Sequence, residues 1–354
     1  MAKAGALIEK LRGCSVTCGA PGRSKKNMKT AFSLGATVLL TAVGGLRGAA
    51  YDPLVVDPNF KAEVRDMSVH DAARNRDIPI RIYLPATDKP EPVILFSHGL
   101  GGTRTGSEFL GEQWSARGYV AVFLQHPGSD DGVWKNEPPA KRLAAMRGAI
   151  SLENFLLRVR DVPVVIDQLE VWDKSGPLAG RMDLAKIGMS GHSFGAATTE
   201  AVSGEMFPVG GAKLTDSRIC AAIIFSPSAP KSGSTERAFN NVKIPWLLMT
   251  GTEDTTIIGG ADVKSRLAVY PAVRGAPKYE VVLDKAEHSV FTDRSLPGEH
   301  EPRNPNHHRV ILALSTAFWD AYLRSDKDAL AWLNGSGPRK VMEPADVWKT
   351  SPGT

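Results

Sequence analysis

Short apolar runs of strand length alternate with longer stretches of helical spacing through most of this chain. The runs are almost continuously apolar, as in strands that are buried on both faces. Expected strands cover residues 93–97, 119–124, 186–190, 220–225, 246–250 and 279–283, and expected helices cover residues 107–117, 141–157, 194–204, 310–323 and 326–333. Strands that alternate with helices predict the α/β class, with a mostly parallel central sheet and helices on both faces. Active sites of such sheets lie at the carboxyl ends of the strands.

Two segments add detail to this arrangement. Residues 64–68 and 78–84 are strand-like runs that precede the alternating part and predict a hairpin. Asp161 is the expected N-cap of a further helix, because Pro163 would then stand in the first turn, where a missing N–H does no harm.

A nucleophile motif stands at the end of one expected strand. Residues 191–195 read Gly-His-Ser-Phe-Gly and match the pattern Gly-x-Ser-x-Gly between a strand and a helix. In that setting the serine occupies a sharp turn with a strained backbone, and the glycines let strand and helix approach closely. The hydroxyl then lies beside a helix N-terminus, whose field favours negative charge. Ser193 is therefore the predicted nucleophile, and the alternative is a structural turn with an idle serine.

A serine hydroxyl needs a base, and His288 is the predicted one. In folds with this motif the order along the chain is Ser, then Asp or Glu, then His. His288 follows the expected strand 279–283, so it stands in a suitable loop. The competing histidines fit that order less well: His98 and His126 precede the serine, His192 is inside the motif, and His307 and His308 begin the last long helix.

The acid is expected at the end of the preceding strand. Residues 246–250 are followed by Gly251-Thr252-Glu253-Asp254, which makes Asp254 the predicted acid and Glu253 the near alternative. Its role would be to hold the imidazole in the useful tautomer and to stabilise its charged form. The loop after residues 220–225 has no carboxylate and offers no competing acid.

Two backbone amides should bind the oxyanion that forms during acyl transfer. One is that of Phe194, the residue after the nucleophile. The other is expected from the glycine-rich loop after residues 93–97, where Leu100 is the predicted donor. A phosphate-binding loop is a poorer interpretation, because no Gly-Lys-Ser/Thr follows.

The basic character of the chain resides in its first fifty residues. The formal net charge is +5. Residues 1–50 contain eight Lys and Arg and one acid, so the remainder is close to neutral, with a net charge of −2. A nucleic-acid partner would need basic clusters in the folded part, so none is expected.

The first fifty residues resemble an export signal. Lysines precede an uncharged run of 16 residues, 31–46, which is shorter than the roughly 20 needed to span a bilayer. Small residues at 48–50 then suit signal-peptidase cleavage between Ala50 and Tyr51. We therefore expect an N-terminal extension over residues 1–50, one catalytic domain over residues 51–354 without a stable membrane span, and a periplasmic or secreted protein. A cytoplasmic location is the alternative, and Met28 is an alternative start.

No cofactor is expected. The three cysteines are too few for a disulfide scaffold, and no His/Cys cluster has the spacing of metal ligands. His307 and His308 are adjacent, and adjacent residues do not share a helix face.

The sequence resembles the α/β-hydrolase superfamily over nearly all of residues 60–335. The motifs FSHGLGG, residues 96–102, and GHSFGA, residues 191–196, are similar to those of dienelactone-hydrolase-like esterases, platelet-activating-factor acetylhydrolases and polyester hydrolases. The stretch 317–333 is similar to other predicted hydrolases of that branch. Two departures limit the likeness. Dienelactone hydrolases use a cysteine where this chain has Ser193, and the eukaryotic acetylhydrolases take their acid from the earlier strand, where this chain has Ser226 and Ser228.

The resemblance implies an α/β-hydrolase fold and the hydrolysis of carboxylic esters by a Ser-His-Asp triad without a cofactor. The ester could be a small molecule, a lipid or a polymer. The alternatives are acyl transfer, a lipid acetylhydrolase, a lactone or polyester hydrolase with the same triad, and a non-catalytic binding protein of this fold. Residues 127–150 could form a cap over the site.

Overall fold

The computed structural model describes residues 50–207, 214–256, 258–296 and 298–353. The predicted signal peptide apart from Ala50, with all its basic residues, lies outside these ranges. Of the residues around the predicted cleavage site, Tyr51 is described: its hydroxyl donates to Asp320 at 2.7 Å, and its ring packs edge-on against Trp332.

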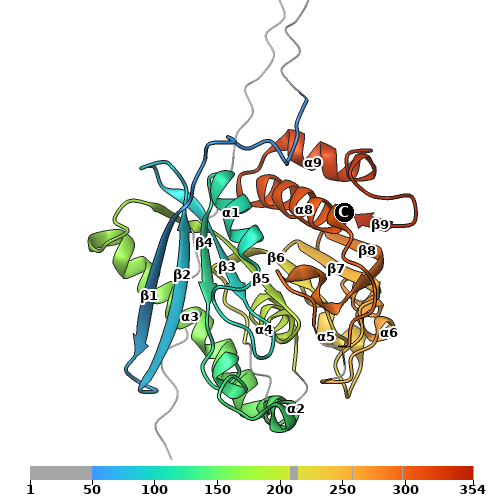
Figure 1. The fold of residues 1–354 in the computed structure, drawn as a ribbon. Helices are drawn as coiled ribbons and strands as arrows, with labels where there is room; N and C mark the ends of the chain where they lie inside the picture. The colour runs from blue at the N-terminus through green and yellow to red at the C-terminus, as the bar shows by residue number, and fades with distance from the viewer. Residues whose placement is uncertain (1–49, 208–213, 257, 297, 354) are drawn as a thin grey trace, which may run out of the picture. The chain divides into compact units, whose positions relative to one another are not determined.

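Nine strands form one mixed sheet in the described part of the chain, in the order β1-β2-β4-β3-β5-β6-β7-β8-β9. The strands are β1 Glu63–Asp71, β2 Arg76–Leu84, β3 Glu91–Ser97, β4 Val120–Leu124, β5 Met182–His192, β6 Ile219–Phe225, β7 Trp246–Glu253, β8 Lys278–Glu287 and β9 Val347–Ser351. The six central strands run parallel. β1 and β2 form the predicted antiparallel hairpin at one edge, and β9 closes the other edge antiparallel to β8 (Figure 1). The α/β class is therefore confirmed.

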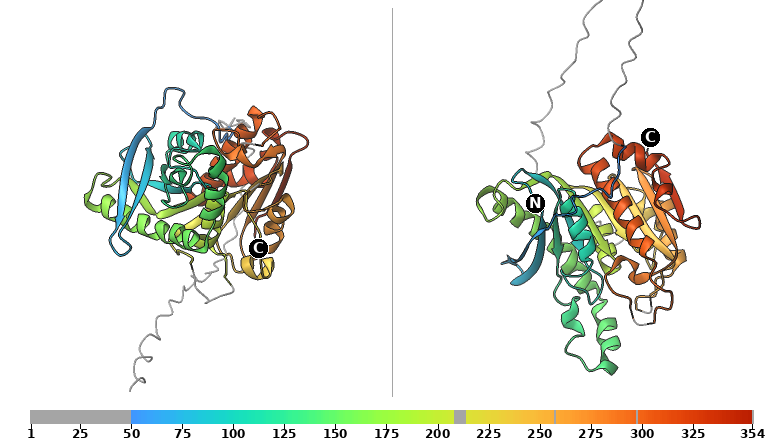
Figure 2. Two further views of the ribbon diagram at one scale, coloured as in Figure 1. Left: turned by 60° about the horizontal axis from the view of Figure 1, so that its bottom comes forward. Right: turned by 45° about the horizontal axis from the view of Figure 1, so that its top comes forward.

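The helices cover both faces of the sheet, as the turned views of Figure 2 show. They are α1 Glu108–Ala116, α2 Pro139–Ala149, α3 Leu152–Ser175, α4 Phe194–Ser203, α5 Thr235–Phe239, α6 Val263–Leu267, α7 Val269–Ala272, α8 Pro305–Leu323 and α9 Lys327–Asn334. The short 3-10 helices in the described ranges are η1 Asp131–Val133, η2 His288–Phe291 and η3 Pro338–Lys340.

Alternation along the strands explains the two layers. Ile94 and Phe96 of β3 join a core with α1, α8 and α9. Val93 and Leu95 of the same strand point the other way and join a core with α3 and α4. Both sets are fully buried, so neither face of the central strands is left for solvent.

Two expectations about this region are wrong. The helix predicted over residues 141–157 is divided, because α2 ends at Ala149 and Ser151 caps α3 by accepting from the amide of Asn154. Asp161 is not an N-cap, since it lies inside α3, and Pro163 is an interior residue of that 24-residue helix. The proline removes one helical hydrogen bond, and the buried contacts of α3 outweigh that loss. The strand β9 was not expected, because four of its five residues are polar or aromatic and only two are half-buried.

Candidate active site

Ser193 lies on a tight turn between β5 and α4. Its φ of 58° and ψ of −111° are unfavourable for a residue with a side chain. A Cβ at Gly195 would lie 1.8 Å from the carbonyl oxygen of Ser97, and one at Gly191 would lie 2.3 Å from the carbonyl oxygen of Gly195. Only glycine fits at these two positions, which explains the spacing of the motif. The Ser193 amide donates to the Phe225 carbonyl at 3.0 Å and ties the turn to β6.

The structure brings the three predicted side chains into one hydrogen-bonded chain. The Ser193 Oγ lies 2.9 Å from His288 Nε2, and His288 Nδ1 lies 2.6 Å from Asp254 Oδ1. Asp254 and His288 are buried, and Ser193 is half-buried. Glu253, the alternative acid, is exposed and outside this chain of contacts.

The Asp254 carboxylate is surrounded by donors. Its Oδ2 accepts from the hydroxyls of Ser226 at 2.7 Å and Thr250 at 2.8 Å. Its Oδ1 lies 3.0 Å from Arg266 Nη2 and accepts from His288. Burial alone would raise the pKa of Asp254, but the hydrogen bond from His288, the charges of His288 and Arg266 and the Ser226 hydroxyl lower it to about 2. Asp254 is therefore ionised at neutral pH.

Arg266 of α6 is a buried residue that sequence reasoning missed. Its Nε donates to the Asp254 carbonyl at 2.6 Å, and its Nη1 donates to the carbonyls of Ser226 and Pro227. Its Nη2 also lies 3.1 Å from His288 Nδ1. Arg266 thus joins the loops after β6 and β7 and places a fixed positive charge beside the imidazole.

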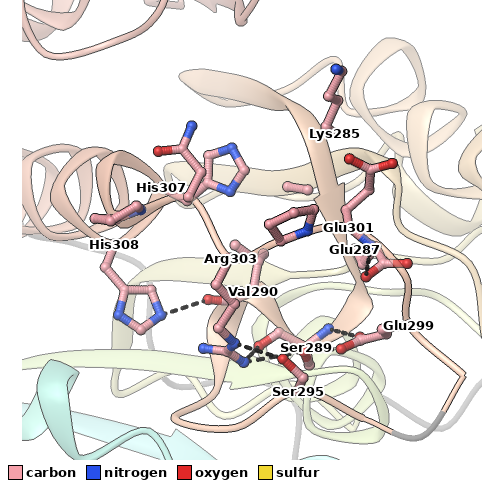
Figure 3. A pocket seen from close by; sticks show the side chains of 14 residues that line it. Lys285, Glu287, Ser289, Val290, Ser295, Glu299, Glu301, Arg303, His307 and His308 are labelled. Atoms are coloured by element: carbon pink, nitrogen blue, oxygen red, sulfur yellow. Dashed lines mark hydrogen bonds between the residues drawn. The ribbon is translucent and has the colours of Figure 1, made fainter.

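A clamp of polar side chains holds both neighbours of His288 (Figure 3). Glu299 accepts from the amide and hydroxyl of Ser289, and Arg303 donates to the carbonyl and hydroxyl of Ser289. Glu287 accepts from the amides of His300 and Glu301. These groups line a cavity of about 170 Å³ that does not reach Ser193. The cavity is thus a feature of the loop that carries His288.

His192, inside the nucleophile motif, packs against the catalytic candidate. Its Nε2 donates to the His288 carbonyl at 2.9 Å, and the two ring centroids are 4.6 Å apart. Burial, with the neighbouring charge of His288 as the next cause, lowers its pKa well below the usual value, so His192 is neutral. Its contacts support the position of His288.

The predicted oxyanion donors belong to two segments that adjoin Ser193. Phe194 begins α4, and a Cβ at Gly99, next to Leu100, would lie 3.4 Å from the Ser193 Cβ. Within the described ranges, neither the Leu100 amide nor the Phe194 amide has a hydrogen-bond acceptor. Both amides are therefore unused by the described part of the fold, which the predicted oxyanion role requires.

A second Ser-His-Asp chain lies beneath this site. Ser97 Oγ is 2.9 Å from His126 Nε2, and His126 Nδ1 is 2.9 Å from Asp161 Oδ2. Asp161 also accepts from Arg76 and forms an ion pair with Arg74, which explains why it is buried inside α3. Ser97, His126 and Asp161 are fully buried, so no substrate can reach them.

The buried His126 predicts acid-sensitive folding. Burial, followed by the charge of Arg158, lowers the pKa of His126 from 6.5 to about 4 in spite of Asp161. The unfolded chain binds a proton near pH 6.5 and the folded chain only near pH 4, so stability is fully present above pH 6.5 and falls as pH drops toward 4. From pH 7.5 to pH 4.5 we expect His126 to account for a loss of about 2 to 3 kcal/mol in the free energy of unfolding.

Urea unfolding of the wild type and of His126→Gln at both pH values measures this loss. The variant should be less stable at pH 7.5 but should lose about 2 to 3 kcal/mol less on acidification. Equal losses in both proteins would show that His126 does not titrate in this way. His192, whose pKa burial also lowers, does not depend on His126 and cancels in the comparison.

Among the described residues, no group of three or more His, Cys, Asp or Glu side chains is arranged to hold a metal ion. No described helix combines the length and the apolar character that crossing a membrane requires. Comparison of the chain with protein-family models and with curated proteins gives no match.

Proposed function

We propose that this chain is a serine carboxylic-ester hydrolase of the α/β-hydrolase fold. The hydrogen-bonded chain from Ser193 through His288 to Asp254 is the observation that carries the proposal. Ser193, Asp254 and His288 follow β5, β7 and β8, and Ser, Asp, His is the order along the chain that this fold uses. The parallel core, the strained turn at Ser193 and the two amides that the described part of the fold leaves unused support the same conclusion.

Acylation is the first half of the proposed reaction. Ser193 Oγ attacks the ester carbonyl carbon while its proton passes to His288 Nε2. The carbonyl oxygen becomes an oxyanion, which the amides of Leu100 and Phe194 bind. Asp254 stabilises the resulting imidazolium through Nδ1. When the tetrahedral intermediate collapses, the bond to the alcohol oxygen breaks and His288 protonates the leaving alcohol.

Deacylation repeats these steps with water. His288 Nε2 takes a proton from water, and the water oxygen attacks the acyl carbonyl carbon. The second tetrahedral intermediate releases the carboxylic acid, and the proton on His288 returns to Ser193 Oγ. All proton transfers use one nitrogen, so the imidazole orientation set by Asp254 serves both halves.

A non-catalytic binding protein is the alternative from another class. It would not require a serine held in a strained conformation or a carboxylate kept ionised beside a histidine. A strained backbone conformation persists only where the surrounding structure enforces it, and such conformations are concentrated at functional sites. The geometry of Ser193 therefore favours catalysis over binding alone.

The segment of residues 127–150 bears on which ester the site accepts. Residues 127–150 contain η1 and α2, and the Trp134 indole of this segment donates to the Gly101 carbonyl beside the site. The side chains of Leu143 and Ile150 on α2 and its C-terminal end are exposed. We propose that this segment borders the acyl-binding region. An assay of esters with increasing acyl length, a phospholipid analogue and a polyester film would identify the class.

A fluorophosphonate probe tests the proposal without knowledge of the substrate. We expect one adduct per chain, mapped by peptide mass spectrometry to Ser193, because only a serine activated by a histidine reacts rapidly. Ser97 is an internal control, since it also contacts a histidine but is fully buried. Labelling of Ser97, or of no serine, would contradict the proposed function.

A further inference from the structure

The loop of residues 98–102, here called the oxyanion loop, is held mainly by hydrogen bonds from residues outside it. In the proposed reaction the Leu100 amide must point at a developing charge, and a donor is effective only when it is held in place before the reaction. Inside the loop, His98 Nδ1 and the Gly102 amide donate to the Gly99 carbonyl. The carbonyls of residues 98, 101 and 102 accept from groups outside the loop. The groups that bind its carbonyls therefore decide where the amide points.

Arg158 of α3 holds the beginning of this loop. Its Nη2 donates to the His98 carbonyl and, at 3.0 Å, to Ser97 Oγ. Its Nη1 donates to Ser129 Oγ at 2.9 Å. The Ser129 carbonyl in turn accepts from the Gly101 amide at 2.8 Å. Arg158 is fully buried, so these contacts replace water entirely.

The same side chain reaches the other oxyanion donor. The Arg158 guanidinium carbon lies 4.7 Å from the centre of the Phe194 ring. Its Nε donates to Thr198 Oγ1 at 3.0 Å, and that hydroxyl donates to the Phe194 carbonyl at 3.0 Å. One planar guanidinium thus contacts groups next to both the Leu100 and the Phe194 amide. A lysine ammonium has too few donors in a fixed geometry to make all of these contacts.

The second Ser-His-Asp chain orients this arginine. Asp161 accepts from the His126 Nδ1–H, so Nε2 accepts the Ser97 hydroxyl proton, and Ser97 Oγ is left to accept from Arg158. Burial lowers the pKa of Arg158 to about 9 against the charge of Asp161, which leaves it cationic at neutral pH. The charge and hydrogen-bond direction of every member of this chain are therefore determined.

Trp134 holds the far end of the loop. Its Nε1 donates to the Gly101 carbonyl at 2.8 Å. A Cβ at Gly101 would lie 2.8 Å from the same nitrogen, so the loop and the indole are in direct contact. We propose that Arg158 and Trp134 are positioning residues that fix the oxyanion loop, so that the Leu100 and Phe194 amides converge on the oxyanion formed at Ser193. This inference rests on the proposed function.

Kinetics of Arg158→Lys and Arg158→Met with p-nitrophenyl butyrate test the proposal. Loss of one oxyanion donor costs about 100- to 1,000-fold in kcat, so a displaced donor should cost about 10- to 100-fold. We expect kcat to fall by that factor with KM changed less than about threefold, and Arg158→Met to lose more than Arg158→Lys. A trifluoromethyl ketone, whose Ser193 adduct carries an oxyanion, should lose affinity in parallel with kcat/KM.

Matched controls separate positioning from general damage. The non-fluorinated ketone of the same chain forms no stable adduct, so its affinity should not change. Arg117→Lys alters another largely buried arginine, whose partners are Asp320 and the Val55 carbonyl, and should leave kcat unchanged. Three results would overturn the proposal. They are an equal loss of affinity for both ketones in the Arg158 variants, an unchanged kcat in both of these variants, and a loss of kcat in Arg117→Lys as large as theirs.

Trp134→Phe keeps the proposal testable if the Arg158 variants do not fold. It removes one N–H from a half-buried ring and leaves no buried charge unpaired. We expect a smaller fall in kcat, about 3- to 10-fold, again with parallel loss of the trifluoromethyl ketone alone. An unchanged kcat together with an unchanged affinity for the trifluoromethyl ketone would overturn the proposal. If the fluorophosphonate probe does not label Ser193, the proposed function fails first; if it does and kcat is unaffected, only this inference fails.

Discussion

Replacement of Ser193 with alanine is expected to lower kcat for p-nitrophenyl butyrate by about 10⁴- to 10⁶-fold. The variant has no oxygen within reach of His288 Nε2, so no acyl-enzyme can form. The fold should survive, because Gly191, Gly195 and the bond from the residue 193 amide to Phe225 shape the turn, and none of them uses the hydroxyl.

Initial rates and thermal unfolding measure these two effects together. Ser203→Ala is the matched control: Ser203 ends α4, the helix that follows Ser193, and is buried. Among the residues that the structure describes, its hydroxyl bonds only the Thr199 carbonyl. Its kcat should equal that of the wild type. Ester turnover by Ser193→Ala within tenfold of the wild type, with an intact fold, would remove Ser193 from the mechanism.

The positions of His288 and Asp254 could be predicted because they depend on topology. Carboxyl ends of parallel strands meet at one edge, so residues that follow β5, β7 and β8 come together whatever the intervening sequence is. The strands themselves were predictable from their apolar runs. Whether these residues act in catalysis remains a prediction, which the geometry supports.

The groups around the three side chains were not predictable in the same way. Arg266 stands on a five-residue helix without any motif, and its importance comes from how far its guanidinium reaches in three dimensions. The loop after β6 has no carboxylate and therefore gives no sequence signal for the site, yet the Ser226 hydroxyl binds Asp254. Asp161 and Pro163 resemble a helix start by local preference, and the contacts of Asp161 with Arg76 and the buried His126 override that preference.

The Asp254→Asn substitution is expected to lower kcat by about 10³- to 10⁴-fold. All four neighbours of the carboxylate donate to it. The hydroxyls of Ser226 and Thr250 can rotate and accept from the new amide nitrogen, whereas Arg266 can only donate. The asparagine oxygen should therefore face Arg266 and His288. It would still accept the Nδ1–H, but it would lack the charge that stabilises the imidazolium.

Stability in acid gives an independent measurement of the same substitution. The folded pKa of Asp254 is about 2, below the ordinary 3.8, so its carboxylate contributes stability above pH 3.8 that is lost as pH falls toward 2. The wild type should lose about 2 kcal/mol of unfolding free energy across that window through this group, and Asp254→Asn should lack this component. Glu253→Gln, which alters the exposed neighbour, should match the wild type in both kcat and acid response. A kcat of Asp254→Asn within tenfold of the wild type would show that the reaction does not need the ionised carboxylate.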